Sequence, residues 1–340
     1  MKTKELQQEL KNKGLDAAIF FKNDPNISYF AEFEADFSLL LVPAQGNQVL
    51  LLTKFDTERA DSLKIKWDYW PDDIFTLLKK HGFKRFGFDA TRLTVKDLEE
   101  FKKNLSGEWT DISSIVWELR KIKTEEEINI LSEACIETDK IFSETINKID
   151  KFKTEAEAAR FMTHKAEEFE GVSFPAIVAS AEHASQPHYV PKSHPIKKGF
   201  LVIDYGIKYK RYCSDVTRTI YIGKPSVEEV QIYQKVLAVQ EKCIQMCKPG
   251  TVIEDLQKFA EKELGNDFIH SLGHGLGIEV HEEPRFKSKE VLKAGMVITI
   301  EPGVYLPGKL GIRIEDDVLI TENGPKVLSR APKQLITVSG

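Results

Sequence analysis

Two aspartates lie inside apolar, strand-like segments of this chain, an arrangement suited to a sheet with a polar centre or a solvated edge. Residues 200–223, FLVIDYGIKYKRYCSDVTRTIYIG, hold two apolar runs on either side of a polar turn at KYK. This pattern predicts a β-hairpin that presents Asp204 and Asp215 from neighbouring strands. One such Asp alone is more often a turn cap or an edge residue, but two on paired strands favour a chemical site.

A histidine follows these strands, enclosed by glycines in SLGHGLGIEVHEEP, residues 271–284. The missing side chains of Gly273 and Gly275 would let other groups approach the His274 imidazole closely. A lone histidine in a glycine-rich turn is usually an ordinary loop residue. This stretch therefore carries weight only beside the other polar residues.

Two glutamates lie at the ends of further strand-like runs. In GMVITIEPGVY, residues 295–305, Glu301 ends an apolar run before a Pro-Gly turn. In GIRIEDDVLI, residues 311–320, strand alternation places Glu315 on the same face as Arg313. We expect Arg313 to orient the Glu315 carboxylate, although an exposed strand face would show the same alternation.

These residues together supply four carboxylates and one imidazole, in the order Asp204, Asp215, His274, Glu301 and Glu315. Four carboxylates gathered without a cation would repel one another or bind protons, whereas two divalent cations would neutralise them. Oxygen ligands with one imidazole favour manganese, cobalt, iron or zinc over a thiolate-type site. The inventory predicts two divalent metal ions per chain, manganese or cobalt first, provided that the five residues meet in space.

The organisation of the chain changes near residue 120. Before it, strand-like runs such as LDAAIFF, FSLLLVPA and QVLLLT alternate with helix-like stretches such as TVKDLEEFKKNL. After it come two long amphipathic helices rich in Glu and Lys, then β-like runs with one more helix around residues 226–247. We expect an α/β domain over residues 1–120 and an α+β domain over residues 121–340.

Composition excludes several classes of protein. The net charge is −5, and both signs are spread along the chain, which argues against a nucleic-acid binder or a polybasic membrane anchor. Four irregularly spaced cysteines do not form a disulfide framework. The N-terminus is polar, and no apolar run approaches the length of a membrane span. We expect a cytoplasmic protein.

Four stretches carry the candidate residues in a fixed order: DYGIKYKRYCSDVTRT, SLGHGLGIEVHEEPR, TIEPGVY and RIEDDVLIT. In this order and spacing they resemble the pita-bread metallopeptidases, a creatinase/aminopeptidase-like family, and within it the Xaa-Pro dipeptidases or prolidases. The resemblance covers about residues 120–335, and PNISYFAEF extends it more loosely to the N-terminal region. It implies an α+β pita-bread catalytic domain after a creatinase/prolidase-like α/β domain.

The resemblance also implies a role for each ligand. Asp204 would chelate one metal ion, and His274 and Glu301 would chelate the other. Asp215 and Glu315 would bridge the two ions, with a hydroxide between them. Glu301 would act as general base as well, taking a proton from the water and passing it to the departing proline nitrogen.

On the substrate side the resemblance points to two more histidines. His281 and His188 would face the substrate and donate hydrogen bonds to it or to the tetrahedral intermediate. Arg285 could pair with the free carboxylate of a C-terminal proline. His183 and His194 match no motif and are expected to be loop residues.

His281 also starts an HE pair, which invites comparison with the H-E-x-x-H zinc helix. Position 285 is Arg where that motif has its second His, and Pro284 would break the helix. The zinc-helix interpretation is therefore rejected.

The function expected from these residues and the resemblance is metal-dependent hydrolysis of the peptide bond before proline in Xaa-Pro dipeptides. One alternative is an Xaa-Pro aminopeptidase that acts on longer peptides. Another is a catalytically inactive peptide-binding module on the same fold, which the presence of all five ligands disfavours. The resemblance further implies a homodimer.

Overall fold

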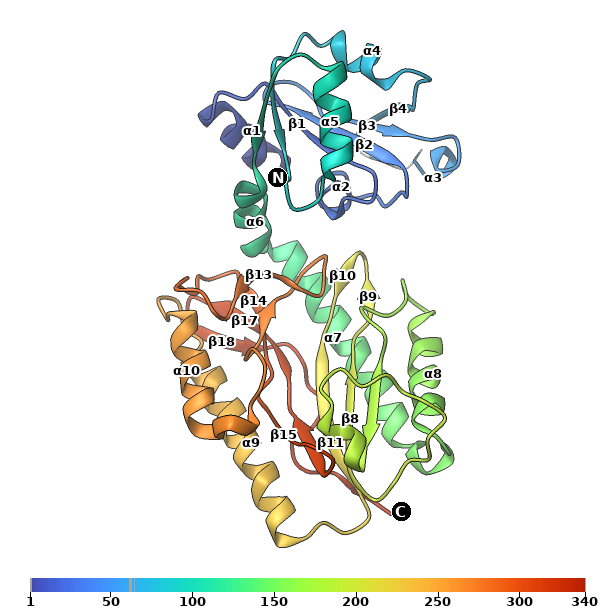
Figure 1. Cartoon of the computed structure of the whole chain (residues 1–340), viewed down its shortest axis with the longest axis vertical. Helices are drawn as coiled ribbons and strands as arrows, with labels where there is room; N and C mark the ends of the chain where they lie inside the picture. Colours follow the sequence, from blue (N-terminus) through green and yellow to red (C-terminus); the bar gives the residue numbers. More distant parts are fainter. Residues whose placement is uncertain (1, 61–62, 64, 340) are drawn as a thin grey trace. The chain divides into compact units, whose positions relative to one another are not determined.

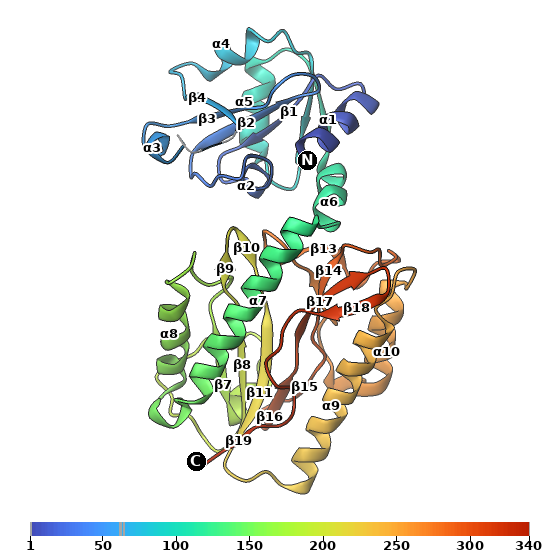
Figure 2. The same cartoon turned by 180° about the vertical axis from the view of Figure 1, so that it is seen from behind.

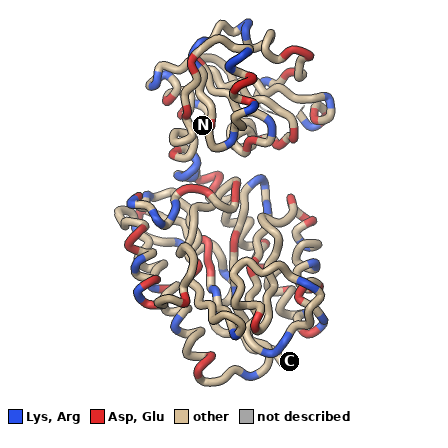
Figure 3. The backbone as a smooth tube through the Cα atoms, in the orientation of Figure 1, with Lys and Arg blue, Asp and Glu red and all other residues tan. Residues whose placement is uncertain are grey.

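The computed structural model describes residues 2–60, 63 and 65–339. The chain divides into two compact units, Met1–Arg120 and Lys121–Gly340. Basic and acidic residues are spread along the backbone of each unit (Figure 3), in keeping with the mixed charge of the sequence. None of the helices in the described part of the chain is long and apolar enough to cross a lipid bilayer.

The first unit is a mixed six-stranded sheet of order β4-β3-β2-β1-β5-β6 with helices packed on it (Figure 1). β1 pairs antiparallel with β2 and parallel with β5. One core joins the sheet to α4 and α5 through buried side chains such as Leu41, Phe86 and Phe101. The elements of this unit are α1 (Lys2–Asn12), β1 (Ala17–Phe21), α2 (Pro25–Ala31), β2 (Ser38–Pro43), β3 (Val49–Leu52), α3 (Thr57–Ala60), β4 (Lys66–Tyr69), α4 (Ile74–Lys79), β5 (Arg85–Phe88), α5 (Val95–Asn104), β6 (Glu108–Asp111) and α6 (Ser113–Lys121).

The second unit places two helix pairs against strands (Figure 2). α7 and α8 pack on β7, β8 and β11, while α9 and α10 pack on the strands that include β14 and β17. Its helices are α7 (Glu125–Ile146), η1 (Ile149–Lys151), α8 (Glu155–Ala166), η2 (Ala181–Ser185), α9 (Val227–Met246), α10 (Ile253–Leu264) and η3 (Gly265–Asp267). Its strands are β7 (Ile177–Ser180), β8 (Gly199–Tyr205), β9 (Lys208–Tyr209), β10 (Tyr212–Cys213), β11 (Val216–Ile222), β12 (His274–Gly275), β13 (Glu282–Arg285), β14 (Val297–Ile300), β15 (Gly303–Leu306), β16 (Leu310–Arg313), β17 (Asp316–Thr321), β18 (Gly324–Val327) and β19 (Thr337–Val338).

Helix starts follow the local sequence. Thr124 caps α7 in a capping box with Glu127, and Thr154 caps α8 through the backbone N–H of Glu157. The expectation of a single further helix after residue 172 was wrong, because α10 follows α9. Its buried Ile253, the first residue of α10, begins an apolar stripe at three- and four-residue spacing that the many charges of IEDLQKFAEKEL obscure.

Candidate active site

The predicted hairpin that carries Asp204 and Asp215 is confirmed. β8 and β11 pair antiparallel with Asp204 opposite Thr217, and the strands continue through a tight turn with positive φ at Lys210 and Arg211. Asp215 directly precedes β11. Because side chains alternate along a strand, Asp215, Thr217 and the facing Asp204 lie on the same side of the sheet.

The glycines around His274 leave room for the backbone of neighbouring strands rather than for groups that approach the imidazole. A Cβ on Gly273 would lie 2.0 Å from the carbonyl oxygen of Thr299, and one on Gly275 would lie 2.1 Å from that of Glu283. His274 Nδ1 donates to the Gly275 carbonyl at 3.1 Å, which leaves a lone pair on Nε2. The glycines thus let the flanking chains close in and fix the direction of the ring.

His274 Nε2 faces two of the predicted carboxylates. It lies 3.5 Å from Asp215 Oδ2 and 3.4 Å from Glu301 Oε1. Asp215, His274 and Glu315 each offer a ligand atom within 4.8 Å of the others. The structure therefore brings together residues that are up to 100 positions apart in the chain.

The two glutamates are held by threonine hydroxyls. Thr299 donates to Glu301 Oε1 at 3.2 Å, and Thr217 donates to Glu315 Oε2 at 2.6 Å. These threonines were not singled out from the sequence. The signal for Thr217 was its position two residues after Asp215 on the same strand face.

The electrostatics of this cluster fit divalent cations. Within the described residues, Asp204 Oδ1 and Glu315 Oε1 are buried and have no hydrogen-bond donor. Burial, and after it the neighbouring carboxylates, raise the pKa of Asp215 and of Glu315, and burial raises the pKa of Glu301 to about 7. Cations would satisfy the two orphaned oxygens and offset the repulsion between the carboxylates.

Arg313 binds Asp204, so the expected pairing with Glu315 was wrong. Its Nη2 lies 2.6 Å from Asp204 Oδ2, and its Nε donates to Thr217 Oγ1 at 3.0 Å. β16 ends at Arg313 and β17 begins at Asp316, so the strand alternation that put Arg313 and Glu315 on one face does not continue. Arg313 touches Glu315 only indirectly, through Thr217.

A chain of hydrogen bonds extends from Arg313 to His270. Arg313 Nη1 donates to the Tyr305 hydroxyl at 2.7 Å, which lies 2.9 Å from His270 Nε2. His270 Nδ1 donates to the Ser271 carbonyl at 2.8 Å, so Nε2 accepts the Tyr305 proton. Burial, and after it Arg313, lower the pKa of His270 to about 4, which keeps the ring neutral.

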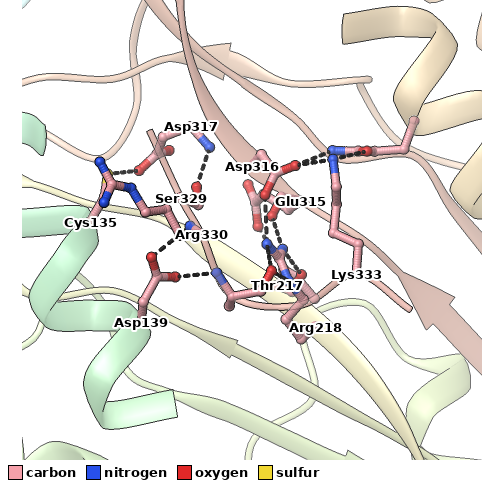
Figure 4. Close-up of polar contacts among 12 residues, drawn as sticks. Cys135, Asp139, Thr217, Arg218, Glu315, Asp316, Asp317, Ser329, Arg330 and Lys333 are labelled. Carbon is pink, nitrogen blue, oxygen red and sulfur yellow. Dashed lines mark hydrogen bonds and ion pairs between the residues drawn. The ribbon is translucent and has the colours of Figure 1, made fainter. Parts of the chain in front are cut away.

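Arg218 links the Glu315 carbonyl to β11 (Figure 4). The guanidinium is buried, pairs with Asp316 at 2.6 Å and donates to the carbonyl oxygens of Thr217 and Glu315. Asp316 also pairs with Lys333 at 2.8 Å. This network joins β11 to the residues that lead into β17, and nothing in the sequence pattern revealed it.

Asp317 supports the backbone of Asp215. Its Oδ2 accepts the Asp215 N–H at 3.0 Å and the Cys135 thiol at 3.2 Å. Burial raises the pKa of Asp317 to about 8. The three consecutive acids at 315–317 thus have separate tasks, and only Glu315 contributes to the cluster that contains Asp215 and His274.

The substrate-side candidates lie in different settings. The His281 ring centroid is 4.3 Å from that of His274. Burial lowers the pKa of His281, and the His188 side chain is exposed. The Arg285 side chain is 82% exposed and pairs with Glu283 at 3.1 Å, so it lies outside the carboxylate cluster. Residues Glu282–Arg285 form a strand, in agreement with rejection of the zinc helix.

The family follows from sequence comparison. Residues 129–322 match metallopeptidase family M24, and residues 2–122 match the creatinase/prolidase N-terminal domain. The chain belongs to metallopeptidase family M24. It is a hydrolase with a creatinase/prolidase-like N-terminal domain and a pita-bread catalytic domain, as the sequence predicted.

Several relatives are similar over most of their length. The chain is 41% identical over 276 residues to an Xaa-Pro dipeptidase of Pyrococcus furiosus, covering 78% of each chain. It matches the solved prolidase of Pyrococcus horikoshii with a TM-score of 0.91 and 34% identity over 98% of this chain and 99% of that one. It matches an X-Pro aminopeptidase of Thermotoga maritima with a TM-score of 0.90 and 30% identity over 96% and 98% of the two chains.

In protein freed of metal ions by a chelator, the Glu301 carboxyl is expected to stabilise the fold more at about pH 6 than at about pH 8. Its pKa of about 7 lies above the ordinary value of 4.5, so the folded chain binds the proton more tightly. This stabilisation is lost as pH rises through the folded pKa. The gain between about pH 8 and about pH 6 is about 1 kcal/mol.

Urea unfolding gives the free energy of unfolding of the chelated protein and of its chelated Glu301→Gln variant at each pH. The difference between the two free energies should grow by this amount from about pH 8 to about pH 6. The contribution of His270, whose pKa is lowered, cancels because both proteins carry this histidine. A difference that stays constant or shrinks on acidification would contradict the raised pKa of Glu301.

Proposed function

We propose that the protein is an Xaa-Pro dipeptidase that uses two divalent metal ions. The observation that carries the proposal is the cluster of Asp215, His274, Glu301 and Glu315, to which Arg313 and Thr217 link Asp204. Two of its carboxylate oxygens, on Asp204 and Glu315, lack a donor among the described residues. The substrate class is supported by the similarity to Xaa-Pro dipeptidases over most of the chain.

In this proposal Asp204 would hold one ion, His274 and Glu301 would hold the other, and Asp215 and Glu315 would contribute to both. The separations of 3.4 and 3.5 Å from His274 Nε2 to Glu301 and Asp215 support this assignment, because they exceed ordinary hydrogen-bond distances and keep the donor atoms close enough to share a cation. When bound, the two ions would polarise the scissile carbonyl and lower the pKa of the attacking water.

The protein's own groups move the protons and hold the substrate. Burial that raises the pKa of Glu301 to about 7 suits a general base that takes a proton from water and returns it to the proline nitrogen. His281, beside His274, and His188 would donate hydrogen bonds to the substrate carbonyl or to the tetrahedral intermediate. Arg313 holds the Asp204 carboxylate in place through its ion pair.

An Xaa-Pro aminopeptidase acting on longer peptides is the second candidate. The similarity to the T. maritima X-Pro aminopeptidase, with a TM-score of 0.90, favours it about as well as the prolidase structures favour a dipeptidase. The two activities differ in whether the free carboxylate of the proline is bound. Arg285, exposed and close in sequence to His281, is the candidate for that contact.

Arg285→Ala is expected to lower kcat/KM for a free Xaa-Pro dipeptide about 10- to 100-fold, because a hydrogen bond between charged groups is lost. The same change should have little effect on a C-terminally amidated Xaa-Pro substrate, which has no carboxylate to pair. Lys287→Ala, which removes another exposed cation two residues away, is the matched control and should leave both substrates unaffected.

The unmutated protein provides the decisive comparison. Equal hydrolysis of free and amidated dipeptides, together with rapid cleavage of longer Xaa-Pro peptides, would favour the aminopeptidase. An equal loss on both substrates in Arg285→Ala would instead assign Arg285 to support of the strand that follows His281.

Manganese or cobalt as the metal, a homodimer and a cytoplasmic location are also part of this proposal. The metal preference is supported by the oxygen-rich ligand set. The location is supported by four buried cysteines that form no disulfide. Metal analysis of protein purified without added metal, sedimentation and cell fractionation test the three in turn.

A further inference from the structure

A second group of polar residues surrounds the buried Glu155, in the first turn of α8. The Glu155 side chain is fully buried, and its Oε1 accepts the Ser180 N–H at 2.8 Å, the Ser180 hydroxyl at 2.8 Å and His183 Nδ1 at 3.0 Å. Its Oε2 accepts the Tyr189 hydroxyl at 2.7 Å. The Tyr189 oxygen in turn lies 3.0 Å from His194 Nδ1. We call these residues the Glu155 cluster: Glu155, Ser180, His183, Tyr189 and His194.

Every side-chain partner of Glu155 comes from one segment, residues 180–189. The backbone of α8 holds the residues that follow: the N–H of Glu155 donates to the carbonyl of His194 and the N–H of Ala156 donates to that of Lys192, both at 3.1 Å. The first turn of the helix therefore uses its free N–H groups and one carboxylate to hold residues 180–194 at both ends. His183 and His194, expected to be ordinary loop residues, belong to this attachment.

The same segment is held from its other side by the hairpin of β15 and β16. The Gly308 N–H donates to Ser185 Oγ at 3.1 Å, and Arg313 Nη1 lies 3.5 Å from the Pro187 carbonyl oxygen. A Cβ on Gly311 would lie 1.8 Å from the Ala184 carbonyl oxygen, so the two backbones are in close contact. Arg313 is also the partner of Asp204, which links this hairpin to the carboxylate cluster.

His188 lies between these two attachments. The residue before it, Pro187, is in contact with Arg313, and the residue after it, Tyr189, is bonded to Glu155. The His188 side chain is itself exposed. The direction of the His188 side chain therefore depends on the positions of Pro187 and Tyr189. Glu155 fixes the position of Tyr189 through their hydrogen bond.

The donor–acceptor distances indicate that the Glu155 cluster is a hydrogen-bond network and not a second metal site. Glu155, His183 and His194 do offer ligand atoms within 4.8 Å of one another. However, the distances of 2.7 to 3.0 Å are those of hydrogen bonds, whereas His274 stands 3.4 and 3.5 Å from its carboxylates. A consistent set of protons also exists, with His194 donating to Tyr189, and Tyr189 and His183 donating to Glu155.

We propose that Glu155 is a positioning residue that holds residues 180–194 in place and thereby aims His188 at the substrate. The inference rests on the proposed function for the role of His188. It assigns Glu155 no contact with the substrate or the metal ions.

The test is Glu155→Gln with Glu157→Gln as its matched control. Glu157 lies in the same helical turn, and its side chain accepts the N–H of Lys153. Glu155→Gln is expected to lower kcat for an Xaa-Pro dipeptide at least about tenfold at unchanged metal content, and Glu157→Gln to change it less than about twofold. Tyr189→Phe removes one hydroxyl from the same network and should shift kcat in the same direction if Glu155→Gln fails to fold.

A double-mutant cycle separates positioning from a general loss of stability. In a His188→Ala background, Glu155→Gln should change kcat less than about twofold, because the residue through which it acts is gone. The same loss in both backgrounds would overturn the proposal. So would a third divalent ion per chain that Glu155→Gln removes, since the cluster would then be a metal site.

Amide hydrogen exchange over residues 180–194 gives a readout that does not depend on the reaction. Faster exchange in Glu155→Gln than in Glu157→Gln supports the attachment, and equal exchange overturns it. If the unmutated protein does not hydrolyse Xaa-Pro dipeptides, the proposed function fails, but the exchange comparison still decides whether Glu155 holds this segment.

Discussion

Glu315→Gln is expected to abolish peptide hydrolysis, with a loss of at least about 100-fold, and to lower the metal content from two ions towards one. Glu315 is 1% exposed, and its Oε1 has no donor within the described residues. An amide cannot offset the charge of two cations and presents only one acceptor oxygen. The loss of one bridging group should therefore weaken the binding of both ions.

The chelated variant provides a control for folding. Burial and neighbouring carboxylates raise the pKa of Glu315, so removing its charge relieves repulsion in the absence of metal. In the unmutated protein the Thr217 hydroxyl donates to Glu315 Oε2 at 2.6 Å, and the oxygen of a Gln side chain can still accept this hydrogen bond. Chelated Glu315→Gln should thus unfold at a temperature no lower than that of the chelated unmutated protein.

Glu322→Gln is the matched substitution, at an exposed glutamate just after β17. It should keep two metal ions and normal turnover. Asp204→Asn and His274→Ala should behave like Glu315→Gln. A Glu315→Gln protein with two tightly bound ions and near-normal turnover would show that the dinuclear assignment is wrong.

The local part of the fold was predictable because short-range chemistry determines it. Alternation of apolar residues and a polar turn were enough to place Asp204 and Asp215 on paired strands. An amphipathic pattern rich in Glu and Lys was enough to predict the two long helices α7 and α8. Where charges outnumber apolar residues, as in α10, the same periodicity was too weak to recognise.

Partners far apart in the sequence were not predictable in this way. Glu155 and Tyr189 are 34 residues apart, and Arg218 and Asp316 are 98 apart, so no local pattern links them. Each pair also depends on a side chain that is polar yet fully buried, which the sequence shows only as another charged residue. The five candidate ligands were singled out as polar residues in or beside strand-like runs, and a family resemblance then connected their positions. The structure adds which oxygen atoms remain without a donor among the described residues.

Arg313 shows where strand alternation misleads. The sequence assigned it to Glu315, two residues away, whereas the structure pairs it with Asp204, 109 residues away, at 2.6 Å. The guanidinium is 3% exposed and makes further bonds to Thr217 and Tyr305. These three partners lie on β8, β11 and β15, so one side chain joins three strands next to the carboxylate cluster.

Arg313→Met is accordingly expected to destabilise the metal-free protein by about 3–5 kcal/mol, because Asp204 is left as an unpaired buried charge. Metal affinity and kcat/KM should both fall at least about tenfold. Arg330→Met, at an exposed arginine, is the control and should change neither. Arg313→Lys keeps the charge without the fork of donors, and provides a milder variant if Arg313→Met does not fold.

Unfolding of double mutants then identifies the partner. If Asp204 is the partner, Arg313→Met should cost much less in an Asp204→Asn background than in the unmutated protein, a coupling of at least about 1 kcal/mol. The coupling to Glu315→Gln should be smaller, since Glu315 acts on Arg313 through the Thr217 hydroxyl and at longer range. A larger coupling to Glu315 than to Asp204 would restore the pairing inferred from strand alternation. It would also mean that Asp204 is held for metal binding by something other than this arginine.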